Sequence, residues 1–256
     1  MSFFAALFAA TLISTHPLEK AEKFQSSEEG MIYFIRHGES VLNVPDPTTG
    51  LLITMGKGIE VPLTEKGKIQ AKSLGTKIAQ KIPQDREIVV CCSASRRAEE
   101  TAHLIVKKLQ KISSCIFGGA YEGLCEQGAG KWEGLPKDAL YHEKLALWEG
   151  LSARDKLAAP KFEGTESYRD VFERTLPEIK NILETFPGKL IFVVSHFQTL
   201  NALQFHLNYE NDEFTTEPKT KLPFISLQNC DLLLLEVPEG NSLAKGQIVT
   251  HLTSDI

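Results

Sequence analysis

The sequence predicts an α/β fold in which helices cover a mostly parallel sheet. Beyond residue 30, short and uniformly apolar runs alternate with longer segments of helical periodicity, which is typical of such a sheet. The chain has 256 residues, of which 42% are hydrophobic, so it is long enough to bury one sizeable core. We therefore expect one domain over residues 31–256, preceded by an N-terminal extension over residues 1–30.

Three segments are predicted to be central strands: residues 31–35, 87–92 and 189–195. Each is too uniformly apolar to lie half exposed. Two later apolar runs, residues 223–228 and 230–237, are expected to form antiparallel strands at one edge of the sheet, with residues 247–252 as a further candidate.

Helices are expected over five segments: residues 63–82, 95–112, 136–148, 165–186 and 197–207. Thr64 is suited to cap the first of them, because a threonine side chain accepts from the backbone of a helix's first turn. Pro136 would occupy the first turn of the third helix, where proline is tolerated. Pro177 removes a backbone donor inside the fourth helix, which we expect to be kinked or divided.

The composition and charge of the chain disfavour some classes of binding partner. The formal net charge is −5 with a pI near 5.9, and lysine and arginine are scattered, which disfavours binding to nucleic acid or to an anionic membrane surface. The five cysteines show no CxxC pair with metal-ligand spacing, so free thiols in a cytoplasmic protein are expected. A small phosphorylated substrate fits this composition, and no particular oligomeric state is indicated.

The N-terminus carries an apolar run from Phe3 to Ile13. Its length suits the core of a signal peptide and is too short for a membrane span, so no stable insertion is expected, but a positive region before it is missing. If it does act as a signal, the protein is exported. An amphipathic helix, a disordered tail, or an upstream artefact with Met31 as the true start are the alternatives.

Polar side chains collect where the three central strands end. The first strand runs into Arg36-His37, the second into Ser93-Ala94-Ser95-Arg96-Arg97, and the third into Ser195-His196. Ligands of an open α/β sheet bind beyond the carboxyl ends of its strands, so these groups are expected to converge. A single histidine after a strand is usually a hydrogen-bonded loop residue. Clustered cationic donors, however, need a neutralising anion, and a dianionic phosphoryl group fits.

Such a cluster suggests a mechanism. Neutral imidazole is nucleophilic near pH 7, so one histidine can attack phosphorus while the arginines hold its oxygens. A carboxylic acid must then protonate the leaving alkoxide and activate water against the phosphohistidine.

Six motifs, in this order, resemble the histidine phosphatase superfamily, the branch that includes cofactor-dependent phosphoglycerate mutase. They are RHGESVLN (36–43), VPLTEKGKIQA (61–71), CSASRRAEETA (92–102), LCEQGAGKWEGL (124–135), EGTESYRDVFER (163–174) and VVSH (193–196). The resemblance spans about residues 31–237 and implies a three-layer α/β/α sandwich, as in phosphoglycerate mutase.

The resemblance also implies roles for individual residues. His37 corresponds to the phosphorylated nucleophile and Glu126 to the proton donor. The phosphate ligands would be Arg36, Asn43, Arg97 and His196. Arg97 rather than Arg96 matches the arginine that precedes the motif's alanine, which leaves Arg96 to solvent.

Other side chains in the motifs are expected to be secondary. Glu133 is a competing carboxylate whose Trp-Glu-Gly context is more typical of loop structure, and Glu39 and Ser40 would support the ligands. The implied mechanism needs neither metal nor cofactor. A metal site at His37, Glu39 and His196 is disfavoured, because the sequence lacks HxH or HExxH spacing there.

The resemblance leaves the reaction open between a phosphatase, a mutase and a catalytically weak protein that binds phosphorylated ligands. A mutase binds two phosphates, and Lys131 is the one positive charge in EQGAGKWEGL, which favours hydrolysis. Two departures from the family pattern bear on the substrate. Residues 44–61 form a long connection that suggests a lid or specificity element, and Phe197 could reshape the pocket or pack on the sheet.

Overall fold

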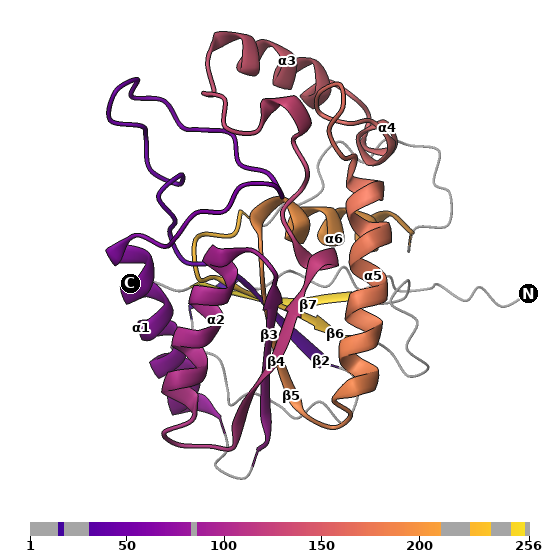
Figure 1. Cartoon of the computed structure of the whole chain (residues 1–256). Coiled ribbons are helices and arrows are strands. Elements are labelled where there is room, and N and C mark those ends of the chain that lie inside the picture. Colours follow the sequence, from indigo (N-terminus) through magenta and orange to yellow (C-terminus); the bar gives the residue numbers. More distant parts are fainter. Residues whose placement is uncertain (1–14, 18–30, 83–85, 211–225, 237–246, 254–256) are drawn as a thin grey trace, which may run out of the picture.

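The computed structural model describes residues 15–17, 31–82, 86–210, 226–236 and 247–253. These residues contain a seven-stranded sheet with the order β1-β7-β6-β2-β5-β3-β4 (Figure 1). The β6 strand runs antiparallel to both of its neighbours, and the other paired strands are parallel. The strands are β1 (Thr15–Pro17), β2 (Met31–Arg36), β3 (Ile88–Ser93), β4 (Cys115–Tyr121), β5 (Leu190–Ser195), β6 (Leu232–Glu236) and β7 (Gln247–Thr253).

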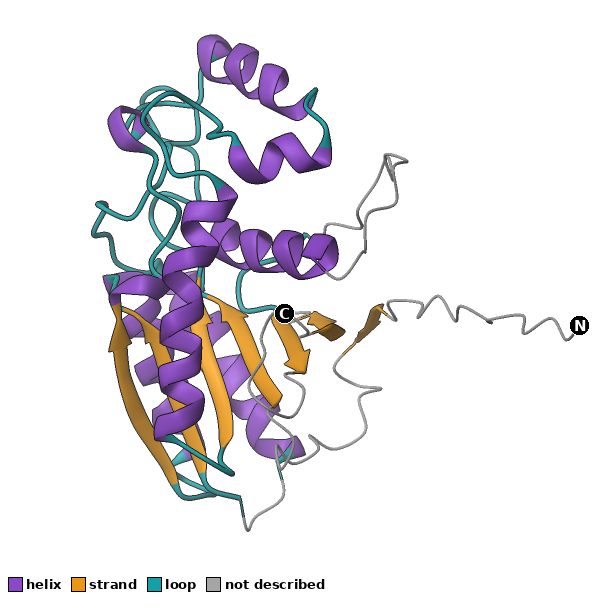
Figure 2. Ribbon diagram, turned by 90° about the vertical axis from the view of Figure 1, so that its right-hand side faces the viewer, coloured by secondary structure: helices purple, strands orange, loops and turns teal. Residues whose placement is uncertain are grey.

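Helices cover both faces of this sheet, which gives the predicted three layers (Figures 1 and 2). Side chains of a strand alternate between the two faces. Tyr33 and Ile35 of β2 accordingly pack with α1 and α2, whereas Ile32 and Phe34 pack with α5 and α6. The α-helices are α1 (Glu65–Lys81), α2 (Arg96–Leu109), α3 (Ala139–Glu149), α4 (Ala153–Ala158), α5 (Tyr168–Thr185) and α6 (Phe197–Glu210), and η2 (Glu122–Leu124) and η3 (Gly130–Trp132) are 3₁₀ turns.

The three predicted central strands are confirmed as β2, β5 and β3, which lie side by side in the sheet. The late strands β6 and β7 pair antiparallel, as expected, but the edge placement of β6 is wrong, because it lies between β7 and β2. The predicted strand at 223–228 is wrong for residues 226–228, which form a loop, and its remainder lies outside the described residues. Of the N-terminal extension, the structure describes β1, which pairs with β7.

Two helix predictions need correction. The division of the fourth helix is wrong, because α5 continues through Pro177 with buried apolar side chains on both sides of it, Phe172 and Ile179 among them. Tertiary packing thus outweighs the missing backbone donor. The third helix begins at Ala139 rather than at Pro136, because Asp138 accepts from the Tyr141 amide and caps it.

The β4 strand and the α4 helix were not predicted. The β4 strand holds the edge of the sheet next to β3, with Ile116 51% exposed and Gly118 and Gly119 at its centre. An edge strand with glycines and exposed positions lacks the continuous apolar run that identified the central strands. The six-residue α4 is too short to show a helical period.

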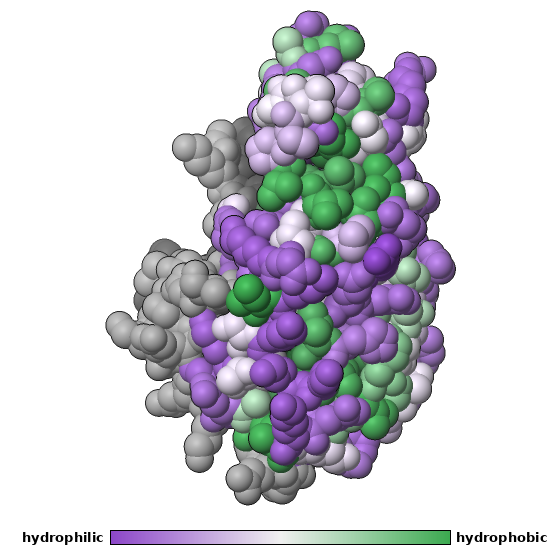
Figure 3. Space-filling model, turned by 60° about the vertical axis from the view of Figure 1, so that its left-hand side comes forward, coloured by the Kyte–Doolittle hydropathy of each residue, from purple (hydrophilic) through white to green (hydrophobic). Residues whose placement is uncertain are grey.

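Residues 44–61 and helices α3 and α4 lie above the carboxyl edge of the sheet (Figure 2). The loop is tied to residues 134–137 by a short antiparallel bridge in which Thr54 N donates to Leu135 O and Lys137 N donates to Leu52 O, both at 2.8 Å. Figure 3 shows hydrophobic side chains gathered in the upper half of the face that it presents. Leu52 and Leu135, on either side of the bridge, are exposed.

In the described part of the chain, no helix combines the length and the apolar character that crossing a bilayer requires.

Candidate active site

The two predicted histidines lie together at the carboxyl edge of the sheet. Strand β2 places His37 beside β5, where the His37 amide donates to Ser195 O at 3.0 Å. His196 follows β5 directly. The two imidazole rings have centroids 5.1 Å apart and meet edge to face. One tetrahedral anion can therefore contact both rings.

The His37 ring is held in one tautomer. Its Nδ1 lies 2.7 Å from the carbonyl oxygen of Gly38, and since a carbonyl accepts only, Nδ1 carries the proton. The opposite nitrogen, Nε2, keeps its lone pair. Burial of the ring, together with the Arg97 and Arg36 charges, holds the pKa of His37 well below its usual range. His37 is therefore a neutral imidazole at pH 7.

Gly38 is required by the close approach of α1. A Cβ at Gly38 would lie 2.6 Å from the carbonyl oxygen of Gly67, in the first turn of that helix. The Gly38 amide also donates to Thr101 Oγ1 of α2 at 3.1 Å. The backbone after β2 is thus fixed between two helices, which sets the direction of the His37 side chain.

Two arginines present buried donors that have no acceptor among the described residues. Arg97 is fully buried; its Nη1 donates to Ile59 O at 2.7 Å, and its Nε and Nη2 lack partners. Arg36 donates from Nη1 to Leu227 O at 2.6 Å, and its Nε lacks a partner. Burial lowers the pKa of both guanidinium groups, against which the Glu126 charge acts. Buried cationic donors of this kind call for an anion.

Arg96 points the other way, as predicted. Its side chain is 58% exposed and pairs with Glu100 at 2.9 Å, one helical turn further along α2. The two adjacent arginines therefore divide into one that faces the site and one that faces solvent.

His196 is oriented by Ser93, the last residue of β3, and by Ser95, two positions further along the chain. Its Nε2 lies 2.8 Å from Ser93 Oγ and 3.1 Å from Ser95 Oγ, while its buried Nδ1 has no partner in the part of the chain that the structure describes. Burial, then the charges of Arg97 and His37, hold the pKa of His196 well below its usual range. The ring is therefore neutral at pH 7, like that of His37.

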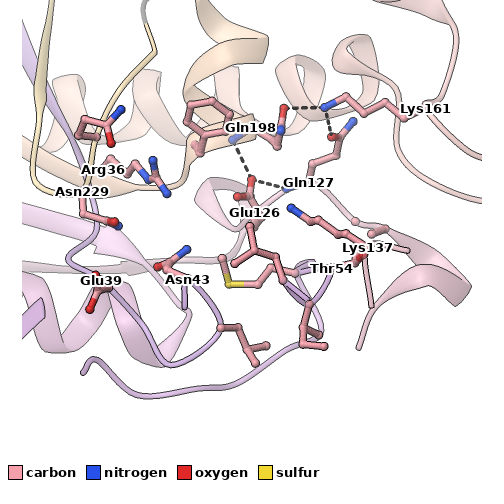
Figure 4. A pocket seen from close by; sticks show the side chains of 18 of the residues that line it. Arg36, Glu39, Asn43, Thr54, Glu126, Gln127, Lys137, Lys161, Gln198 and Asn229 are labelled. Atoms are coloured by element: carbon pink, nitrogen blue, oxygen red, sulfur yellow. Dashed lines mark hydrogen bonds between the residues drawn. The ribbon is translucent and has the colours of Figure 1, made fainter. Parts of the chain in front are cut away.

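Glu126 sits against the start of α6. Its Oε1 accepts from the amides of Gln127 at 2.9 Å and of Gln198 and Thr199, both at 3.2 Å. Amides at a helix N-terminus stabilise negative charge and fix one carboxyl oxygen. Figure 4 shows the carboxyl group at the centre of the pocket wall.

Asn43 and Glu39 line the same pocket. Asn43 Oδ1 accepts from the amide and the hydroxyl of Ser40, at 2.8 and 3.0 Å, so its NH₂ group faces away from Ser40. Glu39 instead accepts from Thr64 Oγ1 and Lys66 Nζ, both at 2.9 Å. Asn43 thus offers donors to a ligand, whereas Glu39 supports the beginning of α1.

The cavity beside these residues has a volume of about 700 Å³. Arg36, Asn43 and Glu126 form part of its wall, whereas His37, Arg97 and His196 are buried and do not. The structure therefore brings the six predicted site residues together, three of them in the cavity wall and three buried outside it. Among the described residues, no three His, Cys, Asp or Glu side chains are grouped so that they could hold a metal ion.

Two lysines in this cavity were missed by sequence reasoning. Lys137 and Lys161 line it, and burial lowers the pKa of both, that of Lys161 to about 7. Lys131, the positive charge that the sequence singled out, is exposed and lies 3.8 Å from Glu163. Lys161 lies 35 positions after Glu126, in another loop, so the sequence around Glu126 does not indicate that Lys161 enters the cavity.

Phe197 and Glu133 have structural roles. The Arg36 guanidinium lies 4.9 Å from the centre of the Phe197 ring, which lines the cavity and also packs against the sheet, as the packing interpretation predicts. Glu133 accepts from the amides of Gly58 at 3.1 Å and Ala129 at 3.0 Å. It therefore joins two loops, as the loop interpretation predicts.

Known proteins resemble this chain in sequence. A metal-independent phosphoserine phosphatase of Arabidopsis thaliana is 27% identical over 184 residues, 71% of this chain and 70% of the relative. A 2,3-bisphosphoglycerate-dependent phosphoglycerate mutase of Gloeobacter violaceus is 24% identical over 242 residues, covering 84% and 99%.

Solved structures share the fold. A mycobacterial glucosyl-3-phosphoglycerate phosphatase superposes with a TM-score of 0.61 at 20% identity, covering 86% of this chain and 97% of the other. Phosphoglycerate mutase from Bacillus anthracis gives 0.61 at 22% identity, covering 86% and 91%. The sequence model of the histidine phosphatase superfamily (branch 1) matches residues 32–243. The chain therefore belongs to the histidine phosphatase superfamily, branch 1.

Proposed function

We propose that the chain is a phosphomonoester hydrolase that acts through a phosphohistidine on His37. The observation that carries this proposal is a neutral imidazole of fixed tautomer surrounded by buried cationic donors that lack acceptors. The Nδ1 proton is held by Gly38 O, so Nε2 is the nucleophile. The substrate is a small phosphorylated molecule.

The reaction has two steps. The Nε2 lone pair of His37 attacks phosphorus and the ester P–O bond breaks, while Glu126 as a carboxylic acid protonates the departing alkoxide. The Glu126 carboxylate then takes a proton from water, whose oxygen attacks phosphorus while the P–N bond breaks and its electron pair returns to Nε2 of His37. Inorganic phosphate leaves, and both side chains return to their starting forms.

Four groups stabilise the phosphoryl oxygens during transfer. Arg36 and Arg97 supply guanidinium donors, Asn43 supplies its NH₂ group, and His196 supplies Nδ1–H when Nε2 accepts from Ser93. These donors are placed before the substrate arrives, so little reorganisation is needed as charge develops.

The experiment is hydrolysis of p-nitrophenyl phosphate by the wild type and by His37→Ala. We expect the variant to lose activity by at least about 10⁴-fold, as when a nucleophile is removed. Arg96→Met is the matched control and should keep wild-type activity, since that side chain points to solvent. Label from a ³²P-ester should be retained on His37 as an acid-labile, base-stable adduct. Equal activity of His37→Ala and wild type would refute the assignment.

Phosphoglycerate mutase-type transfer is a second candidate, favoured by one observation. Lys137 and Lys161 line the cavity and provide the extra positive charge that binding a second phosphate requires. Partition of the labelled phosphoenzyme between water and an added phosphoglycerate separates the two reactions. Label recovered mainly as inorganic phosphate supports hydrolysis, and label recovered mainly in a bisphosphate supports transfer.

A protein that only binds phosphorylated ligands would give a third result. It would bind vanadate or inorganic phosphate without turning over any ester, and wild type and His37→Ala would then be equally inactive. That result would also overturn the hydrolase proposal.

A further inference from the structure

Lys161 enters the cavity from the loop between α4 and α5. Its ammonium donates to the amide oxygens of Gln198 at 2.6 Å and Gln127 at 3.3 Å. The rings of Trp148 and Tyr168 lie beneath it, with centroids 5.1 and 4.8 Å from Nζ. The side chain is therefore held in one place by four neighbours.

None of these four neighbours carries a negative charge. In the described part of the chain, Lys161 forms no ion pair within 4.0 Å, although five other lysines and two arginines do. Glu126 and Glu149 act on it only at longer range. An enclosed ammonium that is held by neutral acceptors gains most from an anion that the protein itself does not supply.

The position of Lys161 indicates which part of a substrate would meet it. Gln127 follows Glu126 in the chain, and Gln198 lies two positions after His196, so the residues that hold Lys161 adjoin the reacting groups. Figure 4 shows Arg36 on one side of Glu126, and Lys161 and Lys137 on the other. With the phosphoryl group at Arg36 and the ester oxygen at Glu126, the alcohol portion points towards the lysines.

We propose that Lys161, positioned by Gln127 and Gln198, binds an anionic group on the alcohol portion of the substrate and selects acidic phosphomonoesters. This inference rests on the proposed function and adds a substrate class to it. A carboxylate or a second phosphate would satisfy the same donor. The apolar wall formed by Leu42, Leu52 and Met55 would contact the carbon skeleton between the two anionic ends.

The test uses two series of alkyl phosphates of increasing length. One series ends in a carboxylate and the other in the neutral, isosteric carboxamide, and both are assayed below the Lys161 pKa of about 7. We expect the wild type to prefer the best carboxylate over its amide by about 10- to 100-fold in kcat/KM, the effect of one charge-assisted hydrogen bond. Alkanediol bisphosphates form a third arm that shows whether phosphate is accepted in place of carboxylate.

Lys161→Met should reduce this preference to within about 3-fold, and Lys161→Arg should retain most of it. Lys131→Met is the matched control, since that lysine is exposed outside the cavity, and should behave as wild type. A wild type that does not distinguish acid from amide, or a Lys161→Met variant that still does, would overturn the inference.

These outcomes are separate from the fate of the hydrolase proposal. Amide esters that are hydrolysed in a His37-dependent reaction without any acid preference would refute the Lys161 site alone. If no ester in any series is hydrolysed, the proposed function fails first.

Discussion

Arg174 of α5 donates hydrogen bonds to both carboxylate oxygens of Glu166, from Nε to Oε1 and from Nη2 to Oε2, each at 3.0 Å. The same guanidinium donates to the carbonyl oxygens of Gly123 at 2.7 Å and Glu126 at 3.0 Å. Glu166 in turn accepts from the Gly128 amide at 2.7 Å. This pair thus binds both ends of the loop that carries the proposed proton donor.

Breaking the pair should loosen that loop. Arg174→Met leaves Glu166 without its two-point partner, and we expect the free energy of unfolding to fall by about 1–3 kcal/mol. We also expect kcat to fall by about 10- to 100-fold, because small displacements of a catalytic group are costly. Chemical denaturation and steady-state kinetics measure the two effects. Arg169→Met, on an exposed position of the same helix, is the control; a loss as large there would contradict the assignment.

The two neighbouring carboxylates should respond differently to neutralisation. Glu126→Gln should lower kcat for alkyl phosphates by about 10²–10⁴-fold, the contribution of general acid–base catalysis. The loss in the first step should be smaller for p-nitrophenyl phosphate, whose leaving group needs no proton. Glu133→Gln should change kcat by less than a few fold, because Glu133 joins loops. Pre-steady-state bursts separate the two steps. A larger loss of kcat in Glu133→Gln than in Glu126→Gln would exchange the roles of the two carboxylates.

Stability should fall on mild acidification. Both His37 and His196 have pKa values well below 6.5 in the folded chain, so the unfolded chain binds more protons between those values and 6.5. The free energy of unfolding should therefore decrease as pH drops below about 6.5, by up to about 1.4 kcal/mol per pH unit for each histidine.

Denaturant titrations at a series of pH values measure this slope. The double variant His37→Asn, His196→Asn should flatten it, whereas His103→Asn, at an exposed position, should not. An unchanged slope in the double variant would show that other groups cause the loss.

Lys161 should lower the free energy of unfolding near pH 7. Burial lowers its pKa to about 7, with Lys137 acting in the same direction and Glu126 and Glu149 in the opposite one. Lys161→Met should therefore raise the free energy of unfolding near pH 7 by about 1–3 kcal/mol. In the wild type the unfolded chain binds more protons from about pH 7 upwards, so stability should rise with pH there. That rise should be absent from the variant; a less stable variant without it would contradict this account.

Gly38→Ala should destabilise the site more than a typical surface change. The added Cβ would lie 2.6 Å from Gly67 O, a backbone atom that cannot turn away. We expect a loss of about 1–3 kcal/mol, as for overpacking in a core. Gly150→Ala is the control, because its Cβ would approach nothing closer than 3.5 Å. Thermal unfolding compares the two, and equal midpoints would contradict the prediction.

The sequence predicted what depends on local pattern. The apolar runs identified β2, β3 and β5 because buried parallel strands need them, and the topology rule for open sheets then brought His37 and His196 together. The resemblance to the family motif separated Arg97 from Arg96. The edge strand β4 was not predicted, because its glycines and the exposed Ile116 leave no such apolar run.

Other features depend on contacts between distant segments. Lys161 and the Arg174–Glu166 pair act on the Glu126 loop from α5 and the loop before it, and no spacing within either segment indicates that contact. Pro177 shows the opposite error, since a local rule predicted a break that packing on both sides of the residue prevents.

The start of α6 positions two groups of the candidate site, His196 and Glu126. His196 immediately precedes this helix, and the amides of Gln198 and Thr199 in its first turn hold Glu126. A tilt or slide of the helix would therefore carry the anion ligand and the proton donor as a single rigid unit. Substitutions that repack the far side of α6 should for that reason alter phosphate affinity and leaving-group protonation in step, even though they touch neither residue.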